Sequence, residues 1–479
     1  MTPIDVLPDD VLLDIFEFWM EQDGTRRIDS SEKKKETEKW QTLVHVCRRW
    51  RTVVFGSPLR LKLALLCTAK TPTRDTLDVW PALPLVICSS GYYPESVDNV
   101  IAALERSDRV CQIKLTNVPN PYLEELLAAN PAIHMPFPEL TQLLLGSHGG
   151  PVFPDSFLGR SAPRLQEISL LSISYRGLPK LLLSATHLVY LEYCNIPHSG
   201  YISPEAMATA LSTLISLKTL ALGFRSPESS PDQESRRPPP LTRSVLPALT
   251  TFWFKGVSEY LDYLVALIDA PQLNGLFIIF FNQIIFDTPQ LIQLVNRTPM
   301  FKAPEKAHVT FGDRAALVKL SSTSSLTSLH SDDGLYVKIS CRELDWQVSS
   351  LEQVFTSSLP PLSALEDLYI YKETSSRPDW QDNIENALWL GLLHLFPAVK
   401  NLYLGVEFAT RIVSVLQELV GSRTTEVLPT LQNIFLEELQ PSGPVQKGIQ
   451  QFVAARQATS HPIAVSLWEN SNQDKIWGY

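Results

Sequence analysis

The sequence contains residues of the kinds that perform catalysis, but none of them stands in a catalytic spacing. No GxSxG, GxGxxG, GxxxxGKS/T or HExxH occurs in the 479 residues, so a nucleophile elbow, a phosphate-binding loop and a zinc helix are all missing. His148-Gly149-Gly150 is similar to an oxyanion-hole turn, but a glycine turn after a strand explains it better. The nine histidines are scattered without metal-ligand spacing. We therefore expect a chain that is not an enzyme and that holds no cofactor and no metal.

Binding chemistry is better represented, in aromatic side chains that recur at one position of a repeated hexapeptide. The hexapeptide reads apolar, two variable, apolar, one variable, apolar. Its fifth position is aromatic in the last five clear copies: Trp253, Phe277, Tyr369, Tyr403 and Phe435. Side chains alternate between the faces of a strand, so positions four and six point inward and position five points outward.

Two interpretations of these aromatic residues stay open. As a contiguous exposed patch they form a binding surface for a target protein, with Lys255, Asp367 and Glu437 nearby. Alternatively, C-terminal helices or long loops cover them, and they form a satellite core.

The hexapeptide itself indicates the architecture. Its ten copies start at residues 110, 140, 165, 188, 217, 249, 273, 365, 399 and 431, and six of them carry a proline two residues before the first apolar position. The Leu-x-x-Leu-x-Leu core is the strand signature of leucine-rich repeats. Between the strands lie apolar helical stripes at 204–217, 257–270, 384–396 and 409–420. We expect an α/β fold in which parallel strands and helices stack into a curved solenoid.

The spacing of the copies is irregular. Successive copies are 23 to 34 residues apart, except for one gap of 92 residues between Leu273 and Leu365. Two degraded strands at 309–311 and 337–339 would fill that gap, and an earlier strand is expected at 85–87. Residues 225–245 contain five prolines and no apolar periodicity, which predicts a disordered insertion.

The N-terminal residues indicate two short amphipathic helices. Pro8 suits a helix start, and Asp9 and Asp10 suit its first turn. An apolar stripe follows, made of Leu12, Ile15, Phe16 and Trp19. A second stripe runs through residues 40–54 and contains Trp40, Leu43, Val44, Cys47 and Trp50.

The sequence of this region closely resembles the F-box motif. The matching residues are Leu7-Pro8-Asp9-Asp10-Val11-Leu12-Leu13, Ile15-Phe16, Leu43 and Val46-Cys47-Arg48-Arg49-Trp50-Arg51. The resemblance covers about residues 4–55, and the repeats that follow are similar in layout to those of F-box proteins with leucine-rich repeats, particularly irregular fungal ones. It implies docking onto a Skp-type adaptor, and through it a cullin, by Leu7, Pro8, Val11, Leu12, Ile15, Phe16, Val46, Cys47 and Trp50. Some of these residues must instead hold the module's own core.

These features predict an order of domains. An F-box domain occupies residues 1–57 and holds a charged insert at 21–39, and a connecting segment follows at 58–80. The repeat solenoid spans 81–458 with its insertion at 225–245, and a tail occupies 459–479.

Composition limits the partners and the compartment. The formal net charge is −10, so nucleic acid is disfavoured as a partner. The start, MTPIDVLPDD, is not a signal peptide, and the most apolar stretch, 276–286, is too short to cross a membrane. The six cysteines are far apart, which argues against disulfides and zinc sites. We expect an intracellular protein of the cytoplasm, the nucleus or both, without a membrane partner.

The resemblance implies the substrate-recognition subunit of a Skp–cullin–F-box (SCF) ubiquitin ligase. The F-box would bind the adaptor and the repeats a target protein of unknown identity. The alternative is a non-catalytic interaction scaffold that does not direct ubiquitination.

Overall fold

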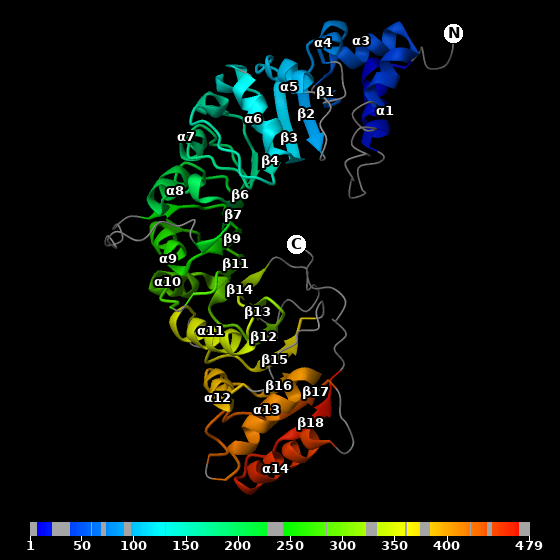
Figure 1. Cartoon of the computed structure of the whole chain (residues 1–479). Coiled ribbons are helices and arrows are strands. Elements are labelled where there is room, and N and C mark those ends of the chain that lie inside the picture. Colours follow the sequence, from blue (N-terminus) through cyan, green and yellow to red (C-terminus); the bar gives the residue numbers. More distant parts are fainter. Residues whose placement is uncertain are drawn as a thin grey trace. The chain divides into compact units, whose positions relative to one another are not determined.

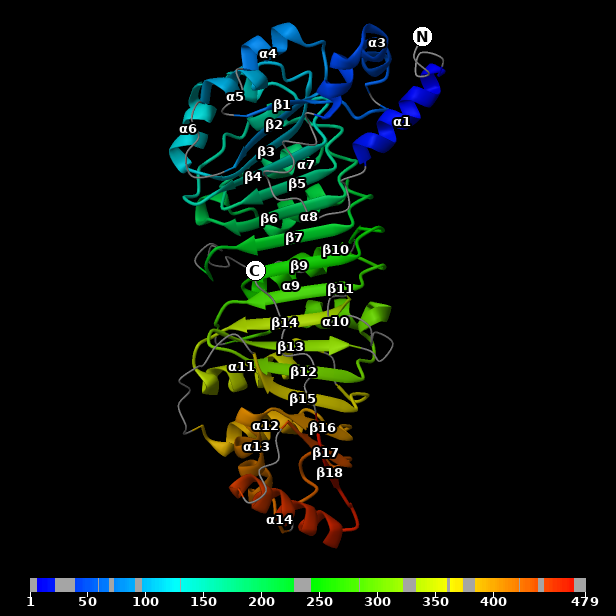
Figure 2. The ribbon, with the colours of Figure 1, turned by 90° about the vertical axis from the view of Figure 1, so that its right-hand side faces the viewer.

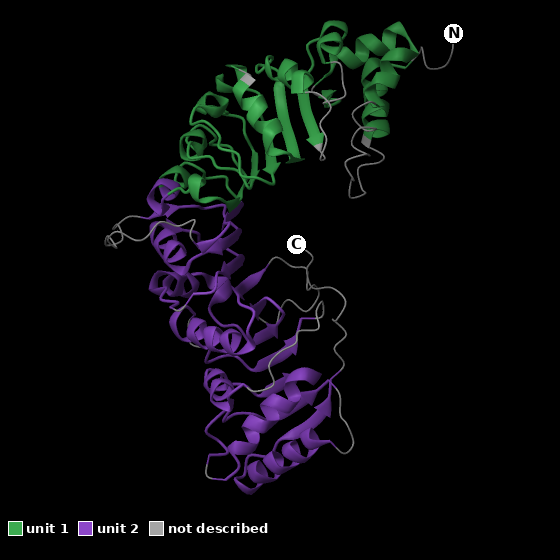
Figure 3. Cartoon of the chain, in the orientation of Figure 1, with its two compact units in different colours: residues 1–202, 209–217 green, residues 203–208, 218–479 purple. Residues whose placement is uncertain are grey.

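The computed structural model forms two compact units (Figure 3). Unit 1 comprises Met1–Ile202 and Thr209–Leu217, and unit 2 comprises Ser203–Ala208 and Lys218–Tyr479. The structure describes residues 7–21, 39–58, 60–68, 73–90, 97–129, 131–227, 243–283, 285–321, 333–359, 362–373, 384–421, 423–437 and 443–468. Most of the predicted charged insert, most of the 225–245 insertion and the end of the predicted tail lie outside these residues. The boundary between the units falls within the predicted solenoid, and the predicted F-box region and the first repeats share unit 1.

The sheet of unit 1 consists of parallel strands in chain order (Figure 1). They are β1 (Leu65–Cys67), β2 (Leu85–Ser90), β3 (Val110–Val118), β4 (Gln142–Ser147), β5 (Glu167–Leu171) and β6 (Tyr190–Ile196). β2 contains the strand expected at 85–87, whereas β1 lies in the segment predicted as a connection. Positions four and six of each hexapeptide point to the core, as Ile168 and Leu170 do with 0% exposure.

Helices cover one face of this sheet. They are α4 (Thr73–Val79), α5 (Val97–Leu104), α6 (Asn120–Ala129) and α7 (Leu178–Leu182), joined by the 3-10 turns η2 (Pro131–His134), η3 (Phe157–Arg160) and η4 (His198–Gly200). Parallel strands need a crossover between them, and these short helices supply it. We call the opposite side of each sheet, where hexapeptide positions three, five and seven point, the outer face.

Unit 2 continues the same construction with more strands. In spatial order they are β7 (Thr219–Phe224), β9 (Thr251–Gly256), β11 (Gly275–Phe280), β14 (Gly334–Ser340), β13 (Ala315–Ser321), β12 (Lys306–Phe311), β15 (Asp367–Lys372), β16 (Asn401–Leu404), β17 (Asn433–Leu436) and β18 (Ala464–Leu467). Figure 2 looks onto the outer face of this sheet. All ten hexapeptides of the chain fall on strands, and β18 lies in the predicted tail.

One part of unit 2 departs from the prediction of parallel strands. The two degraded strands are present as β12 and β14, but a further strand, β13, lies between them and pairs antiparallel to both. Only residues 312–314 separate β12 from β13, and Gly312 donates its amide to the carbonyl of Ala315 at 2.9 Å. A turn this short permits only antiparallel pairing. As a result β14 pairs with β11, and β12 pairs with β15, in the reverse of chain order.

The helices of unit 2 include the three predicted at 257–270, 384–396 and 409–420. They are α9 (Ser258–Leu267), α10 (Pro289–Arg297), α11 (Leu344–Ser357), α12 (Asn386–His394), α13 (Val406–Glu418) and α14 (Pro444–Ala458), with the turn η6 (Pro299–Phe301) after α10. α8 (Pro204–Leu211) forms within the stripe predicted at 204–217. α9, α10 and α11 line the side of the sheet away from the outer face (Figure 1). No helix among the described residues is both long and apolar enough to cross a bilayer.

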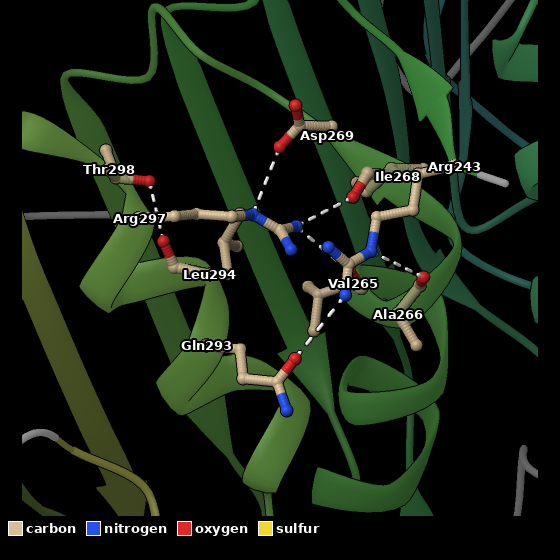
Figure 4. Close-up of polar contacts among 9 residues, drawn as sticks. All are labelled: Arg243, Val265, Ala266, Ile268, Asp269, Gln293, Leu294, Arg297 and Thr298. Atoms are coloured by element: carbon tan, nitrogen blue, oxygen red, sulfur yellow. Dashed lines mark hydrogen bonds and ion pairs between the residues drawn. The ribbon is translucent and has the colours of Figure 1, made fainter. Parts of the chain in front are cut away.

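Two arginines form polar contacts at the end of α9 and with the residues that follow it (Figure 4). Arg297, the last residue of α10, donates to the carbonyl of Ile268 at 2.9 Å and pairs with Asp269 at 3.0 Å. Arg243 donates to the carbonyl of Ala266, near the end of α9, at 3.2 Å. The last carbonyls of a helix lack partners inside the helix, and the guanidinium groups satisfy them. Strand β8 (Ser244–Val245) follows Arg243 and pairs with β10 (Ile268–Asp269), so the end of the predicted disordered insertion is an ordered strand.

Candidate interaction surfaces

The first helix, α1 (Asp9–Glu21), has two apolar faces instead of the single predicted stripe. It begins at Asp9, as the acidic first turn predicts. Leu12 and Phe16 are buried, with 1% exposure each. Ile15 is 46% exposed and Phe18 is 65% exposed. Val11 and Trp19 are exposed as well, at 37% and 38%. We call Val11, Ile15, Phe18 and Trp19 the apolar face of α1.

Contacts to the following helices fix the orientation of α1. The ring of Phe16 lies 4.7 Å from that of Trp50, centroid to centroid. Arg49 pairs with the carboxylate of Asp9 at 2.7 Å and also donates to the carbonyl of Leu7. These contacts hold the buried side of α1 inward, so its apolar face stays on the surface.

The second predicted stripe is not one helix. Residues 39–46 are helical, Cys47 is extended, and α3 (Arg48–Gly56) begins after it. The break occurs because Cys47 caps α3: its sulfur accepts the amide of Trp50 at 3.4 Å. Trp40 is 1% exposed and donates its indole N–H to the carbonyl of Ala64 at 3.1 Å.

The structure therefore divides the residues assigned to adaptor docking. Leu12 and Phe16 lie in the module's own core, and Trp50 is half-buried against Phe16. Exposed or half-exposed members of the set are Leu7, Pro8, Val11, Ile15, Val46 and Cys47. Phe18 and Trp19 were not in the set. The spacing of Phe18, seven residues after Val11, was the signal that could have found it.

The second surface is a row of side chains across the outer face of unit 2. Strand register places Trp253, Phe277 and Tyr336 side by side on β9, β11 and β14. Lys319 on β13 comes next, because the antiparallel register pairs it with Tyr336 and with His308. His308, Tyr369, Tyr403 and Phe435 then follow on β12, β15, β16 and β17. We call these eight residues the central row.

The central row brings together the five aromatic residues predicted from the sequence and adds three residues to them. Tyr336, Lys319 and His308 were missed because their strands lack the leucine-rich hexapeptide. Around Lys319 and His308 buried residues nevertheless alternate with half-buried ones, whereas the first four residues of β14, Tyr336 among them, are all buried. A period of two alone was the available signal.

Ring stacking runs along the central row. His308 and Tyr369 stack with centroids 4.3 Å apart, Tyr369 and Tyr403 at 4.1 Å, and Tyr403 and Phe435 at 4.5 Å, all within 8° of parallel. Phe277 and Tyr336 stack at 4.5 Å. Trp468, just after β18, meets Tyr369 and Tyr403 edge-on at 5.7 and 5.6 Å. The rings thus cover one another's faces. Seven of the eight residues of the row are half-buried, and Tyr336 is buried, with 7% exposure. The row therefore lies between the two interpretations that the sequence leaves open, an exposed patch and a covered satellite core.

The charged residues of this surface are unevenly distributed. Burial lowers the pKa of Lys319. Burial and the charges of Lys319 and Lys306 lower the pKa of His308 to about 4, so its ring is neutral at neutral pH. The carboxylate of Asp367 forms an ion pair with Lys306 at 3.7 Å and accepts a hydrogen bond from the side-chain amide of Asn401. Glu437 accepts the amide of Val406 at 3.2 Å.

The described residues contain no cluster of three or more histidine, cysteine or acidic side chains that could hold a metal ion. The two surfaces consist of apolar, aromatic and charged side chains.

Comparison with known proteins gives few matches. No protein-family model matches the chain, and no curated protein matches it. Among solved structures the chain is similar to the leucine-rich repeat-containing protein LegL7 from Legionella pneumophila, at 12% sequence identity. That similarity covers 81% of this chain and 97% of the other chain, with a TM-score of 0.25.

Proposed function

We propose that the protein is the substrate-recognition subunit of an SCF-type ubiquitin ligase. In this proposal the N-terminal helices bind a Skp-type adaptor, which links the chain to a cullin, and the outer face of unit 2 binds a target protein. Ubiquitin transfer is performed by the partners, and the chain supplies no catalytic group.

The observation that carries the adaptor half is the apolar face of α1. Four large apolar side chains on one helix are exposed in a region whose sequence resembles the F-box motif. Val46, at the end of helical residues 39–46, is 58% exposed and belongs to the same motif. Apolar anchors of this kind enter a partner's groove and supply most of the affinity in helix-mediated recognition.

Charge reversal on α1 tests this half. The double variant Val11→Glu/Ile15→Glu places carboxylates on the apolar face and leaves the buried residues Leu12 and Phe16 in place. Mixed with a purified Skp-type adaptor, the wild-type chain should form a complex in calorimetric titration. The variant should bind about 1000-fold more weakly or not at all, because each of the two anchors contributes roughly 2 kcal/mol.

A matched control shows that the effect is local. Leu183→Glu/Ile215→Glu changes two apolar residues of unit 1 that are 50% and 63% exposed but lie outside the motif. It should bind the adaptor as the wild type does. Equal binding by both double variants, or no binding by the wild type, would refute adaptor docking.

The target half is tested by the fate of bound proteins. A protein captured by the wild-type chain should have a longer half-life when the chain is replaced by Val11→Glu/Ile15→Glu. An unchanged half-life for every captured protein would favour the scaffold that binds without directing degradation.

A further inference from the structure

Five adjacent strands of unit 2 together carry four lysines, and no aspartate or glutamate, at their outward positions. The outward positions of β9, β11, β14, β13 and β12 hold Lys255, Lys338, Lys319 and Lys306, and the others are aromatic, aliphatic, hydroxyl-bearing or glycine. The whole chain has a net charge of −10. This face therefore reverses the sign of the protein's overall charge.

Three of the four lysines are not neutralised within the described part of the chain. Lys306 pairs with Asp367, whereas Lys255, Lys319 and Lys338 form no ion pair with another described residue. The ammonium of Lys319 lies 4.9 Å from the ring centroid of Tyr336, and that of Lys255 lies 5.8 Å from the ring of Phe281. Such cation–π contacts position a lysine but leave its charge available to an anion.

A pocket extends this surface at the edge where β11 and β14 end. It has a volume of about 410 Å³ and is lined by Asn282, Arg314, Ser340, Cys341, Arg342, Glu343 and Trp346. Ser340 lies two residues beyond Lys338 on the same face of β14, roughly 7 Å away. Neither arginine side chain bonds to another described residue, and Glu343 is the single carboxylate in the lining. Two free guanidinium groups suit a carboxylate ligand.

The stacked rings favour the same kind of ligand. From His308 to Phe435 each ring stacks on the next, with centroids 4.1 to 4.5 Å apart, so neighbouring rings cover each other's faces. The edges of these rings are electropositive, and Tyr369 and Tyr403 carry hydroxyls as well. Edges and hydroxyls attract carboxylate and carbonyl oxygens. Between neighbouring rings of this run no face is left on which a nucleic-acid base could stack.

The length of the surface indicates an extended chain. Eight strands lie between β9 and β17, counted inclusively. At about 4.8 Å between strands the central row is roughly 34 Å long, which matches about ten residues of extended polypeptide. We infer that the outer face of unit 2 binds an extended acidic polypeptide segment of about this length. Its carboxylates lie at Lys255, Lys319 and Lys338, and one acidic side chain enters the pocket between Arg314 and Arg342.

This inference names the chemistry of the target and so rests on the target half of the proposed function. The test uses the full-length protein and a library of random peptides of about 12 residues, displayed on phage. Peptides selected by the wild type should be enriched in aspartate and glutamate. Selection should be repeated with Lys255→Glu/Lys338→Glu and with Lys302→Glu/Lys447→Glu, a control of equal charge change at exposed lysines outside these strands.

Acidic enrichment should vanish with Lys255→Glu/Lys338→Glu and persist with the control. In fluorescence anisotropy, the best acidic peptide should bind the first variant about tenfold more weakly, and its glutamine analogue should bind the wild type about tenfold more weakly. The inference is overturned by a pool without acidic enrichment, by enrichment that both variants keep, or by the absence of any binder. It is also overturned if single-stranded RNA of similar length binds more tightly than the acidic peptide.

The result is separable from the adaptor experiment. Val11→Glu/Ile15→Glu should leave peptide binding unchanged, and Lys255→Glu/Lys338→Glu should leave adaptor binding unchanged. A wild-type chain that selects acidic peptides but does not bind the adaptor contradicts the ligase role alone. A wild-type chain that binds the adaptor but selects no acidic peptides contradicts the nature of the target alone.

Discussion

Position five of the hexapeptide distinguishes the two units. In unit 1 it holds Lys114, Leu144, Ser169 and Glu192, whereas from Trp253 onward in unit 2 it holds only aromatic residues. Positions four and six do not differ in this way: Ile168 and Leu170 in unit 1 are as fully buried as Phe252 and Phe254 in unit 2. The core therefore constrains the inward positions of every repeat, while the outer face is free to differ. That freedom gives unit 1 a polar outer face and unit 2 an aromatic and basic one.

The largest effect is expected at the inward positions, equally in both units. Leu368→Ala in unit 2 and Ile168→Ala in unit 1 each remove a side chain with 0% exposure. Each should lower the free energy of unfolding by about 3 kcal/mol, because both leave a cavity. Hydrogen exchange of the surrounding strands measures this locally, as repeat proteins need not unfold in one step. A loss under 1 kcal/mol in one unit would show that its core is packed differently.

Acid should weaken unit 2 through His308. The pKa of this residue is about 4 in the folded chain, below its ordinary 6.5, so between these values only the unfolded chain takes up the proton. Stability is therefore full above pH 6.5 and declines as the pH falls to about 4, by up to about 3 kcal/mol. His308→Phe keeps a ring in the stack and removes the titration, so its strands should lose less protection in acid. Identical pH dependence in the two proteins would contradict this account.

Truncation within the stack should have a smaller effect. Tyr403→Ala removes the ring that stacks on both Tyr369 and Phe435. Two aromatic contacts of this kind contribute about 2 kcal/mol together. Tyr403→Phe keeps the ring and should retain most of the stability. If alanine and phenylalanine behave alike, the stacking does not stabilise the sheet.

The polar outer face of unit 1 should respond least. Ser169 donates a hydrogen bond to the carboxylate of Glu192 at 2.6 Å, and Tyr190 donates to the same group at 3.3 Å. Ser169→Ala should lower the free energy of unfolding by about 1 kcal/mol, the usual contribution of such a bond. Exchange rates in β5 and β6 report the change. A loss as large as that of Ile168→Ala would end the distinction between inward and outward positions.

In the N-terminal helices the sequence predicts the elements but not which apolar side chains are buried. The motif located α1 and its acidic start, since capping and the first turn are local features. It could not divide the apolar residues between the core and the surface. Phe16 is buried because Trp50 packs against it, and Ile15, one residue earlier, is exposed. That choice depends on partners more than thirty residues away.

The sequence by itself determined the repeat: the ten hexapeptide strands, their inward residues and five members of the central row follow from a period of two within strands and a recurring hexapeptide. The strands β1, β13 and β18 carry no hexapeptide and were not predicted. Tertiary structure alone decided the order of β14, β13 and β12, and with it the placement of Tyr336, Lys319 and His308 between Phe277 and Tyr369. Strand pairing joins residues far apart in the chain, and a short turn after β12 reversed the direction of the next strand. No local pattern records which neighbour a strand will find.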